Sequence, residues 1–164
     1  LDAAALLEEI AAGVDRADLE QAIGELYELA GREETAKIWK GRALGAYLRS
    51  AQSGDVHYYH HLVDYYADVA EDGANATLWA LKDIALRENF STQAALAWAY
   101  FRAGRFTDAV LWSDRALNSG ASSAKLCHQA AQIHLAAGNP SKSAALLTLA
   151  QSINPCVESF HIHH

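Results

Sequence analysis

The residues with the clearest potential for chemistry are histidines in the stretch "DVHYYHHLVDYY", residues 55–66. On a helix, His57, His60 and Asp64 would follow one another at spacings of three and four residues. His57 and His61 would also lie four residues apart, on one face. Imidazole nitrogens and a carboxylate at these spacings could ligate zinc or another transition metal. A metal site at this position is therefore one hypothesis.

The rest of the chain offers little support for catalysis. The tail "FHIHH" adds His161, His163 and His164, which resemble part of a purification tag. No Cys or Glu completes a recognised ligand pattern such as HExxH, and adventitious metal binding by the tail is the simpler interpretation. A glycine-rich phosphate loop, a serine nucleophile elbow and a Cys–His signature are all missing from the sequence. We expect no catalytic residues, no cofactor and no enzyme activity.

Composition narrows the class of partner. The net charge is −7 and the sequence contains no Lys/Arg cluster that could follow phosphates, so we do not expect a nucleic-acid partner. No apolar run approaches the length of about 18 residues that a membrane span needs. We expect a cytoplasmic protein, or a periplasmic or secreted one if a signal precedes Leu1. Because the sequence has no methionine, we expect it to be a fragment of a longer protein.

The composition also predicts an all-α fold. The 164 residues include only two prolines and ten glycines, while alanine, leucine and glutamate are abundant. The alternation of apolar and polar residues that marks a β-strand is nearly absent. The length suits a single domain with one core.

A repeat organises these helices. Gly104 and Gly138 are 34 residues apart, and each follows about a dozen helix-forming residues and precedes an alanine-rich amphipathic run. Gly31 has the same surroundings, and Gly73 is the best glycine for a looser fourth unit. If each glycine takes the fifteenth place of a unit, the twentieth and twenty-seventh places hold small residues. These are Ala36, Ala43, Ala109, Ala116, Ser143 and Ala150, with Ala85 and Leu86 near the end of the looser unit.

This pattern resembles the tetratricopeptide repeat (TPR), and more narrowly a fragment of a bacterial-type TPR domain. The resemblance implies a right-handed superhelical solenoid of antiparallel helix pairs, with about four hairpins after an N-terminal helix. The tryptophan usual at the fourth place is missing, and the glycine intervals are 42, 31 and 34 residues. The first interval predicts a long helix over residues 33–53.

The expected organisation is one TPR-like domain over residues 1–164. Residues 1–15 would form a capping helix or the end of an upstream repeat, and residues 156–164 a histidine-containing tail. The hairpins would cover residues 17–53, 56–89, 90–120 and 123–155.

In a TPR array, the first helix of each hairpin lines a concave groove. Carried onto this sequence, the groove positions are His60, Val63, Glu71, Trp98, Phe101, Arg102, Lys125, His128 and Gln132. Trp98, Phe101 and Arg102 would share one face and form a binding hot spot, since aromatic residues and arginine contribute much interface energy. The alternative is that Trp98 and Phe101 only pack against a neighbouring helix.

The resemblance implies a non-catalytic scaffold that binds a protein, through a peptide or a partner helix in this groove. A carboxylate-bearing peptide near Arg102 and Lys125 is one ligand to consider. Two alternatives stay open: a metal-binding helical module using His57, His60, His61 and Asp64, and a self-associating structural segment of a larger protein. Exposed ends of the array would also allow a homodimer.

Overall fold

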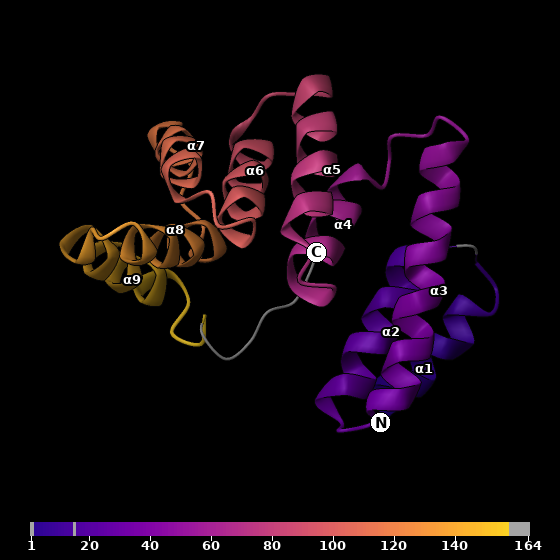
Figure 1. The fold of residues 1–164 in the computed structure, drawn as a ribbon. Coiled ribbons are helices and arrows are strands. Elements are labelled where there is room, and N and C mark those ends of the chain that lie inside the picture. The colour runs from indigo at the N-terminus through magenta and orange to yellow at the C-terminus, as the bar shows by residue number, and fades with distance from the viewer. Residues whose placement is uncertain (1, 15, 158–164) are drawn as a thin grey trace. The chain divides into compact units, whose positions relative to one another are not determined.

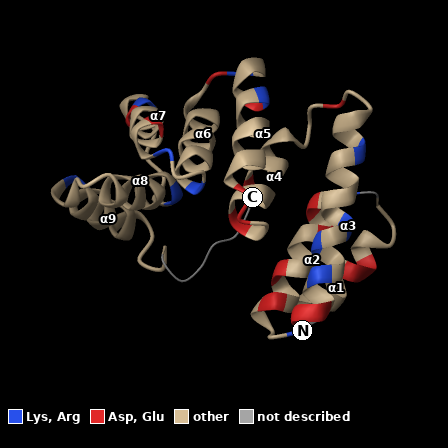
Figure 2. Ribbon diagram, viewed as in Figure 1, with Lys and Arg blue, Asp and Glu red and all other residues tan. Residues whose placement is uncertain are grey.

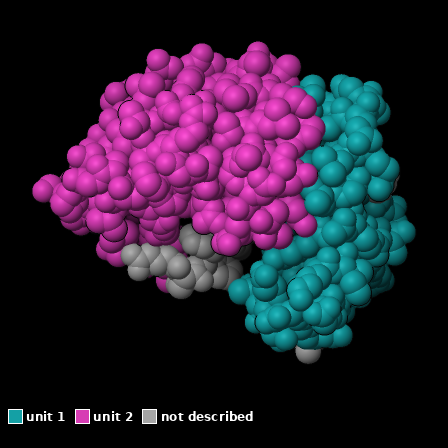
Figure 3. Space-filling model, viewed as in Figure 1, with its two compact units in different colours: residues 1–62 teal, residues 63–164 magenta. Residues whose placement is uncertain are grey.

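The structure is a computed structural model that describes residues 2–14 and 16–157, so the predicted tail histidines lie outside the described residues. Across these ranges the chain is helical and contains no strand, which confirms the all-α prediction (Figure 1). The chain divides into two compact units, residues 1–62 (unit 1) and residues 63–164 (unit 2) (Figure 3). The predicted division into one domain with four hairpin ranges stays a prediction.

Unit 1 contains three helices, α1 (Asp2–Ala11), α2 (Ala17–Leu29) and α3 (Glu33–Gln52), followed by the start of α4 (Tyr59–Asp64). Helix α2 packs against both α1 and α3. A Cβ atom at Gly24 would lie 2.7 Å from Cγ of Lys40 and 3.1 Å from the carbonyl oxygen of Ala36. The glycine therefore lets α2 and α3 approach closely.

Unit 2 contains the end of α4, the π-helix η1 (Tyr65–Val69), and helices α5 (Gly73–Leu86) and α6 (Phe90–Arg102). Helices α7 (Phe106–Asn118), α8 (Ala124–Ala136) and α9 (Pro140–Ile153) follow. Consecutive helices pack together, and α6 also contacts η1 and α8. Helix α6 is therefore the central helix of a face formed by α4–η1, α6 and α8.

The turns between paired helices share one backbone geometry. Gly31, Gly104 and Gly138 adopt left-handed φ values of 72°, 73° and 80°, which a glycine reaches without steric cost. The next residue in each turn donates its N–H to a carbonyl five residues earlier, at 2.8 Å in all three turns. These features close each helix in the Schellman manner. The predicted role of the three glycines is confirmed.

The fourth turn corrects the sequence analysis, because its left-handed residue is Glu71, at φ 52°, and not a glycine. Gly73 is instead the first residue of α5. A Cβ atom at Gly73 would lie 2.4 Å from the backbone of Arg102 and Ala103, so this glycine is required for packing. This turn has no glycine signal in the sequence, because a glutamate occupies its left-handed position. We call α4–η1 and α5 the Glu71 hairpin, and α6 and α7 the Gly104 hairpin.

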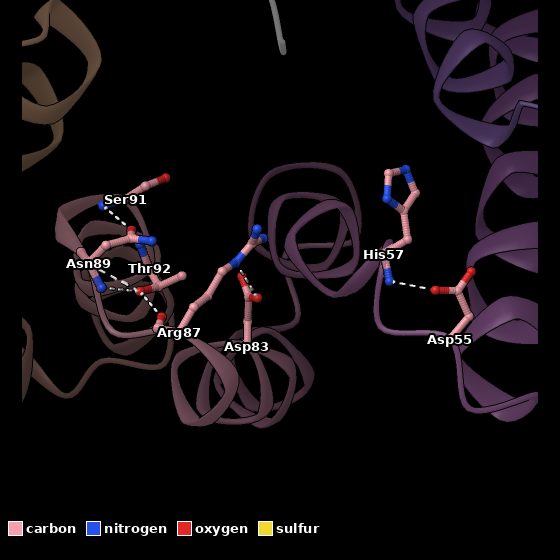
Figure 4. A network of polar contacts seen from close by, with 7 residues as sticks. All are labelled: Asp55, His57, Asp83, Arg87, Asn89, Ser91 and Thr92. Atoms are coloured by element: carbon pink, nitrogen blue, oxygen red, sulfur yellow. Dashed lines mark hydrogen bonds and ion pairs between the residues drawn. The ribbon is translucent and has the colours of Figure 1, made fainter.

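In the second helix of the Glu71 hairpin, a buried carboxylate occupies the position that is alanine in the other three hairpins. Twelve residues after each turn lie Ala43, Ala116 and Ala150, all 0% exposed, but in the Glu71 hairpin this position is Asp83, 2% exposed. The equivalent position therefore lies two residues before Ala85, which the sequence places near the end of the looser unit. Asp83 pairs with Arg87 through one oxygen at 3.4 Å, and its other oxygen has no hydrogen-bond partner in the described part of the chain (Figure 4).

The Glu71 hairpin also contains an extra residue in its first helix. The N–H of Asp72 bonds to the carbonyl of Tyr66, six residues earlier, where the other three turns span five. The π-helical segment Tyr65–Val69 accommodates this insertion. The insertion shifts the residues before it by one place relative to the turn.

Candidate functional site

The candidate site is the face of unit 2 formed by the end of α4 (from Val63), η1, α6 and α8, which we call the first-helix face. Its central helix α6 begins at a capping box (Figure 4). The Asn89 side chain accepts hydrogen bonds from the N–H groups of Ser91 and Thr92, and the Thr92 hydroxyl accepts one from the N–H of Asn89. This local sequence fixes where α6 starts, and so where the aromatic residues later in the helix point.

Trp98 lies at the base of this face. Its side chain is only 8% exposed, and its indole Nε1 donates a 2.8 Å hydrogen bond to Oδ1 of Asp68 in η1. The ring stacks on Phe101 with centroids 4.8 Å apart. Trp98 is therefore mainly a packing residue, as the alternative interpretation held, and it does not present a large surface to a partner.

The aromatic rings become more accessible away from Trp98. Phe101 is half-buried, and its ring centroid lies 5.9 Å from that of Phe106, the first residue of α7. Phe106 is 41% exposed. On α8, Leu135 is 61% exposed and follows Gln132 by three residues, on the same side of the helix. Phe101 and Leu135 give the face accessible apolar surface, and Phe106 extends this surface onto the start of α7.

Two basic side chains on the face are already paired with carboxylates. Arg102 forms a 2.8 Å ion pair with Glu71, and Lys125 lies 3.5 Å from the carboxylate of Asp64. The pairs join residues 31 and 61 positions apart in sequence. The face is thus assembled from three segments that are distant in sequence.

The remaining predicted groove residues fall in different places. His128 and Gln132 lie on α8, as Lys125 does. His128 is buried, and its ring nitrogen Nε2 lies 3.2 Å from the amide nitrogen of Gln132. Val63 is 1% exposed and belongs to the core, which corrects its assignment to the groove. His60 belongs to unit 1, where its ring lies 5.8 Å from that of His61.

Asp68 is the residue that sequence reasoning missed altogether. It was missed because the second unit was aligned on Gly73, two residues after the true turn at Glu71. Alignment on Glu71 puts Asp68 at the same place relative to the turn as Phe101 in the Gly104 hairpin. The signal available in the sequence was the apolar pair Leu62 and Val63. This pair matches Leu96 and Ala97 once one extra residue is allowed before the turn, and all four residues are buried.

The proposed metal ligands do not form a ligand set. Within the described ranges, no three His, Cys, Asp or Glu side chains are placed to hold a metal ion together. Helix α4 begins at Tyr59, so His57 lies in a turn, with its N–H bonded to Asp55 (Figure 4), and the helical spacing to His61 does not apply. The His61 ring stacks on Tyr47, 5.3 Å away, and Asp64 faces Lys125. These residues therefore lie in different surroundings and do not converge on one point.

A second polar site lies between α7, the end of α8 and the start of α9. A pocket of about 470 Å³ there is lined by residues including Asp114, His134 and Lys142. Asp114 accepts a 2.6 Å hydrogen bond from Lys142 and lies 3.0 Å from Nε2 of His134. Burial acts to raise the pKa of Asp114, but the bonds from Lys142 and His134 outweigh it, so the pKa falls below its usual value. The pocket carboxylate is therefore already satisfied.

The acidic charge of the protein is concentrated in unit 1. Residues 1–62 contain 11 acidic and 6 basic residues, whereas residues 63–164 contain 9 and 7 (Figure 2). In the described ranges, no helix combines the length and the apolar character that crossing a membrane requires. In unit 2 the numbers of acidic and basic residues are nearly equal. The arrangement of individual charged side chains on the first-helix face therefore matters more than the net charge of the unit.

Comparison with known proteins concerns the fold. No family model and no curated protein matches the sequence. The solved structure titled MamA MSR-1, in crystal form C2, matches at 17% identity over 93% of this chain and 86% of that chain, with a TM-score of 0.53. MamA AMB-1 in crystal form P212121 matches at 19% identity over 94% and 89%, with a TM-score of 0.55. MamA AMB-1 in crystal form C2221 matches at 20% identity over 93% of this chain and 87% of that chain, with a TM-score of 0.51.

These structures are TPR-like helical proteins, and the likeness extends over nearly all of each chain. Together with the shared left-handed turns, it shows that this chain has a TPR-like fold, as the repeat predicted. At such identities the likeness carries no information about a ligand.

Proposed function

We propose that this chain is a non-catalytic protein-interaction scaffold that binds a peptide or a partner helix on the first-helix face of unit 2. The observation that carries the proposal is a set of contacts that joins three first-helix segments on one face: Asp68 of η1 accepts a hydrogen bond from Trp98 of α6, and Asp64 of α4 lies beside Lys125 of α8. Helical hairpins that stack in this way present the side chains of their first helices on a common surface. The TPR-like fold supports the same class of function.

The energetics favour Phe101 and Phe106 as the anchors, in place of Trp98. A partly exposed ring next to a buried one can bury further apolar area at little cost in conformational entropy. Arg102 and Lys125 would form part of the polar rim, where their existing ion pairs limit their contribution to affinity. The buried Trp98 would support the anchors by fixing the orientation of Phe101.

Site-specific photocrosslinking tests the proposal. A benzophenone amino acid replaces Phe106 in one variant and Leu111 in a matched control, since both residues lie on α7 and are 41% and 50% exposed. The two side chains point in different directions, because five residues turn a helix by about 140°. We expect a partner protein to crosslink from position 106 and not from position 111.

Three other results would contradict the proposal. Crosslinking from position 111 alone would place the interaction on another face. Crosslinks only between two copies of the chain would make the face a self-association surface. A lack of adducts from both positions, in cells where the chain is expressed at its native level, would argue against a protein partner for this region.

A further inference from the structure

We infer that the segment recognised by the first-helix face carries a positive charge, a lysine or arginine side chain that binds at Asp68 beside an apolar residue. The inference rests on the proposed function and adds the chemistry of the ligand. It differs from the carboxylate-bearing peptide that Arg102 and Lys125 suggested in the sequence.

The first step is the charge balance of the face. Arg102 and Lys125 each lie beside a carboxylate, Glu71 and Asp64 respectively. Each carboxylate offsets part of the positive charge beside it, so the attraction of this face for an anionic ligand is reduced. The two basic side chains of the face are therefore poor indicators of a negatively charged ligand.

The second step is the state of Asp68. Its side chain is exposed, and its partner among the described residues is the neutral indole N–H of Trp98, 2.8 Å from Oδ1. The hydrogen bond orients the carboxylate but does not neutralise it. Oδ2 is left to accept a charge-assisted hydrogen bond from a ligand cation.

The third step is the neighbourhood of that carboxylate. Trp98 stacks on Phe101, which in turn lies beside Phe106, so an aromatic row starts at the residue bonded to Asp68. The stem of a lysine or arginine packs well along aromatic rings, and its charge interacts favourably with their faces. An apolar residue next to the cation in the ligand would cover Phe106.

The one-residue insertion in η1 gives the arrangement a structural cause. The π-helical turn Tyr65–Val69 contains Asp68, and such insertions are frequent at functional sites. Glu71 holds a strained left-handed conformation at the end of the same segment.

The test is a parallel selection of random twelve-residue peptides on three full-length proteins. They are the wild type, Asp68→Asn, and Asp108→Asn as a control that removes a carboxylate from α7, where Asp108 pairs with Arg105. Asparagine at position 68 keeps an oxygen for the Trp98 N–H and removes only the charge. The indole N–H signal of Trp98 in an NMR spectrum verifies that this hydrogen bond persists.

We expect the wild type and Asp108→Asn to enrich peptides with Lys or Arg next to an apolar residue, and Asp68→Asn to lose this enrichment. The best basic peptide should bind Asp68→Asn roughly tenfold more weakly at physiological salt. Replacing the selected Lys or Arg by Gln in the peptide should weaken binding to the wild type by a similar factor.

Three results would overturn the inference in different ways. Enrichment of acidic peptides that depend on Arg102 and Lys125 would contradict a cationic ligand but leave the first-helix face as the binding surface. Selected peptides whose affinity is unchanged by Phe106→Ala would contradict the face itself, and so the proposed function. If no peptide were selected, the inferred recognition of a basic peptide would also be wrong.

Discussion

The Glu71 hairpin and the Gly104 hairpin are neighbouring copies of one repeat, and they differ at the positions that define it. The Gly104 hairpin has glycine at the turn and a fully buried Ala116 at the helix crossing. The Glu71 hairpin has a strained glutamate and the buried Asp83 at these two positions. Its first helix also contains a π-helical insertion.

The comparison shows that the geometry of a repeat persists when its signature residues are lost. The N–H after Glu71 still bonds back across the turn at 2.8 Å, as it does after Gly104. Each departure costs stability locally, and natural proteins tolerate such costs most often near functional sites. Here the departures surround Asp68, which the Gly104 hairpin replaces with an aromatic residue at the same place.

The largest expected effect comes from Gly73→Ala. The new Cβ would lie 2.4 Å from the backbone of the α6–α7 turn, which cannot move away as a side chain could. We expect the free energy of unfolding to fall by about 3 kcal/mol in urea titrations. Gly41→Ala is the control, because no atom lies within 4 Å of its new Cβ, and it should stabilise α3 by about 0.5–1 kcal/mol. Equal effects of the two substitutions would contradict the packing role of Gly73.

Asp83→Ala should make the Glu71 hairpin more like the other hairpins. It removes a 2% exposed carboxylate with one unsatisfied oxygen and leaves Arg87, which is largely exposed. We expect the free energy of unfolding to rise by about 1–3 kcal/mol, measured by urea denaturation. A loss of stability would show instead that the carboxylate makes an interaction on which this hairpin depends.

Substitutions at the left-handed residues of the two turns should change the free energy of unfolding by a smaller amount. Glu71→Gly relieves the left-handed strain but gives up the exposed ion pair with Arg102, so we expect a gain of about 0.5–1 kcal/mol. Gly104→Ala should cost about 1 kcal/mol, because its φ of 73° disfavours a side chain. Thermal melts of both variants measure the effect, and changes of the same sign would contradict the equivalence of the two turns.

The smallest effect concerns pH. Because the pKa of Asp114 is lowered in the folded state, the carboxylate stabilises the fold above its unfolded pKa, and this contribution is lost as the pH falls through the folded value. Asp114→Asn should therefore cost at most about 1 kcal/mol at pH 7, and the difference from the wild type should vanish in acid. Asp108→Asn, at an exposed ion pair, is the control. A difference that grows on acidification would contradict the lowered pKa.

The fold was predictable because, in the described part of the chain, glycine occupies the left-handed position in three of the four turns that join the two helices of a hairpin. The chain must reach a left-handed conformation at Gly31, Gly104 and Gly138, and glycine is the residue that does so without strain. The long helix after Gly31 was also predicted and is observed as Glu33–Gln52. The turn at Glu71 could not be predicted, because a glutamate rarely adopts a left-handed conformation and so gives no sequence signal of a turn.

The candidate site was predictable only in part. The sequence predicts Arg102 and Lys125 as groove residues, but their carboxylate partners follow from the register of α4–η1, which depends on the π-helical insertion. Trp98 was named as a contact residue, although its burial depends on how closely η1 approaches α6. Burial and partner choice are properties of packed helices, and they could not be taken from the spacing of residues within one helix.

The most direct test of the central claim is hydrogen–deuterium exchange of the full chain, free and bound to a protein identified by crosslinking. The account predicts slower exchange on binding in η1 and its turn, residues 65–72, and in the second half of α6, residues 96–103. Helix α9 should exchange at the same rate in both states. Protection confined to α7 and α9, with residues 65–72 unchanged, would show that the partner binds elsewhere and that the first-helix face is not the functional surface.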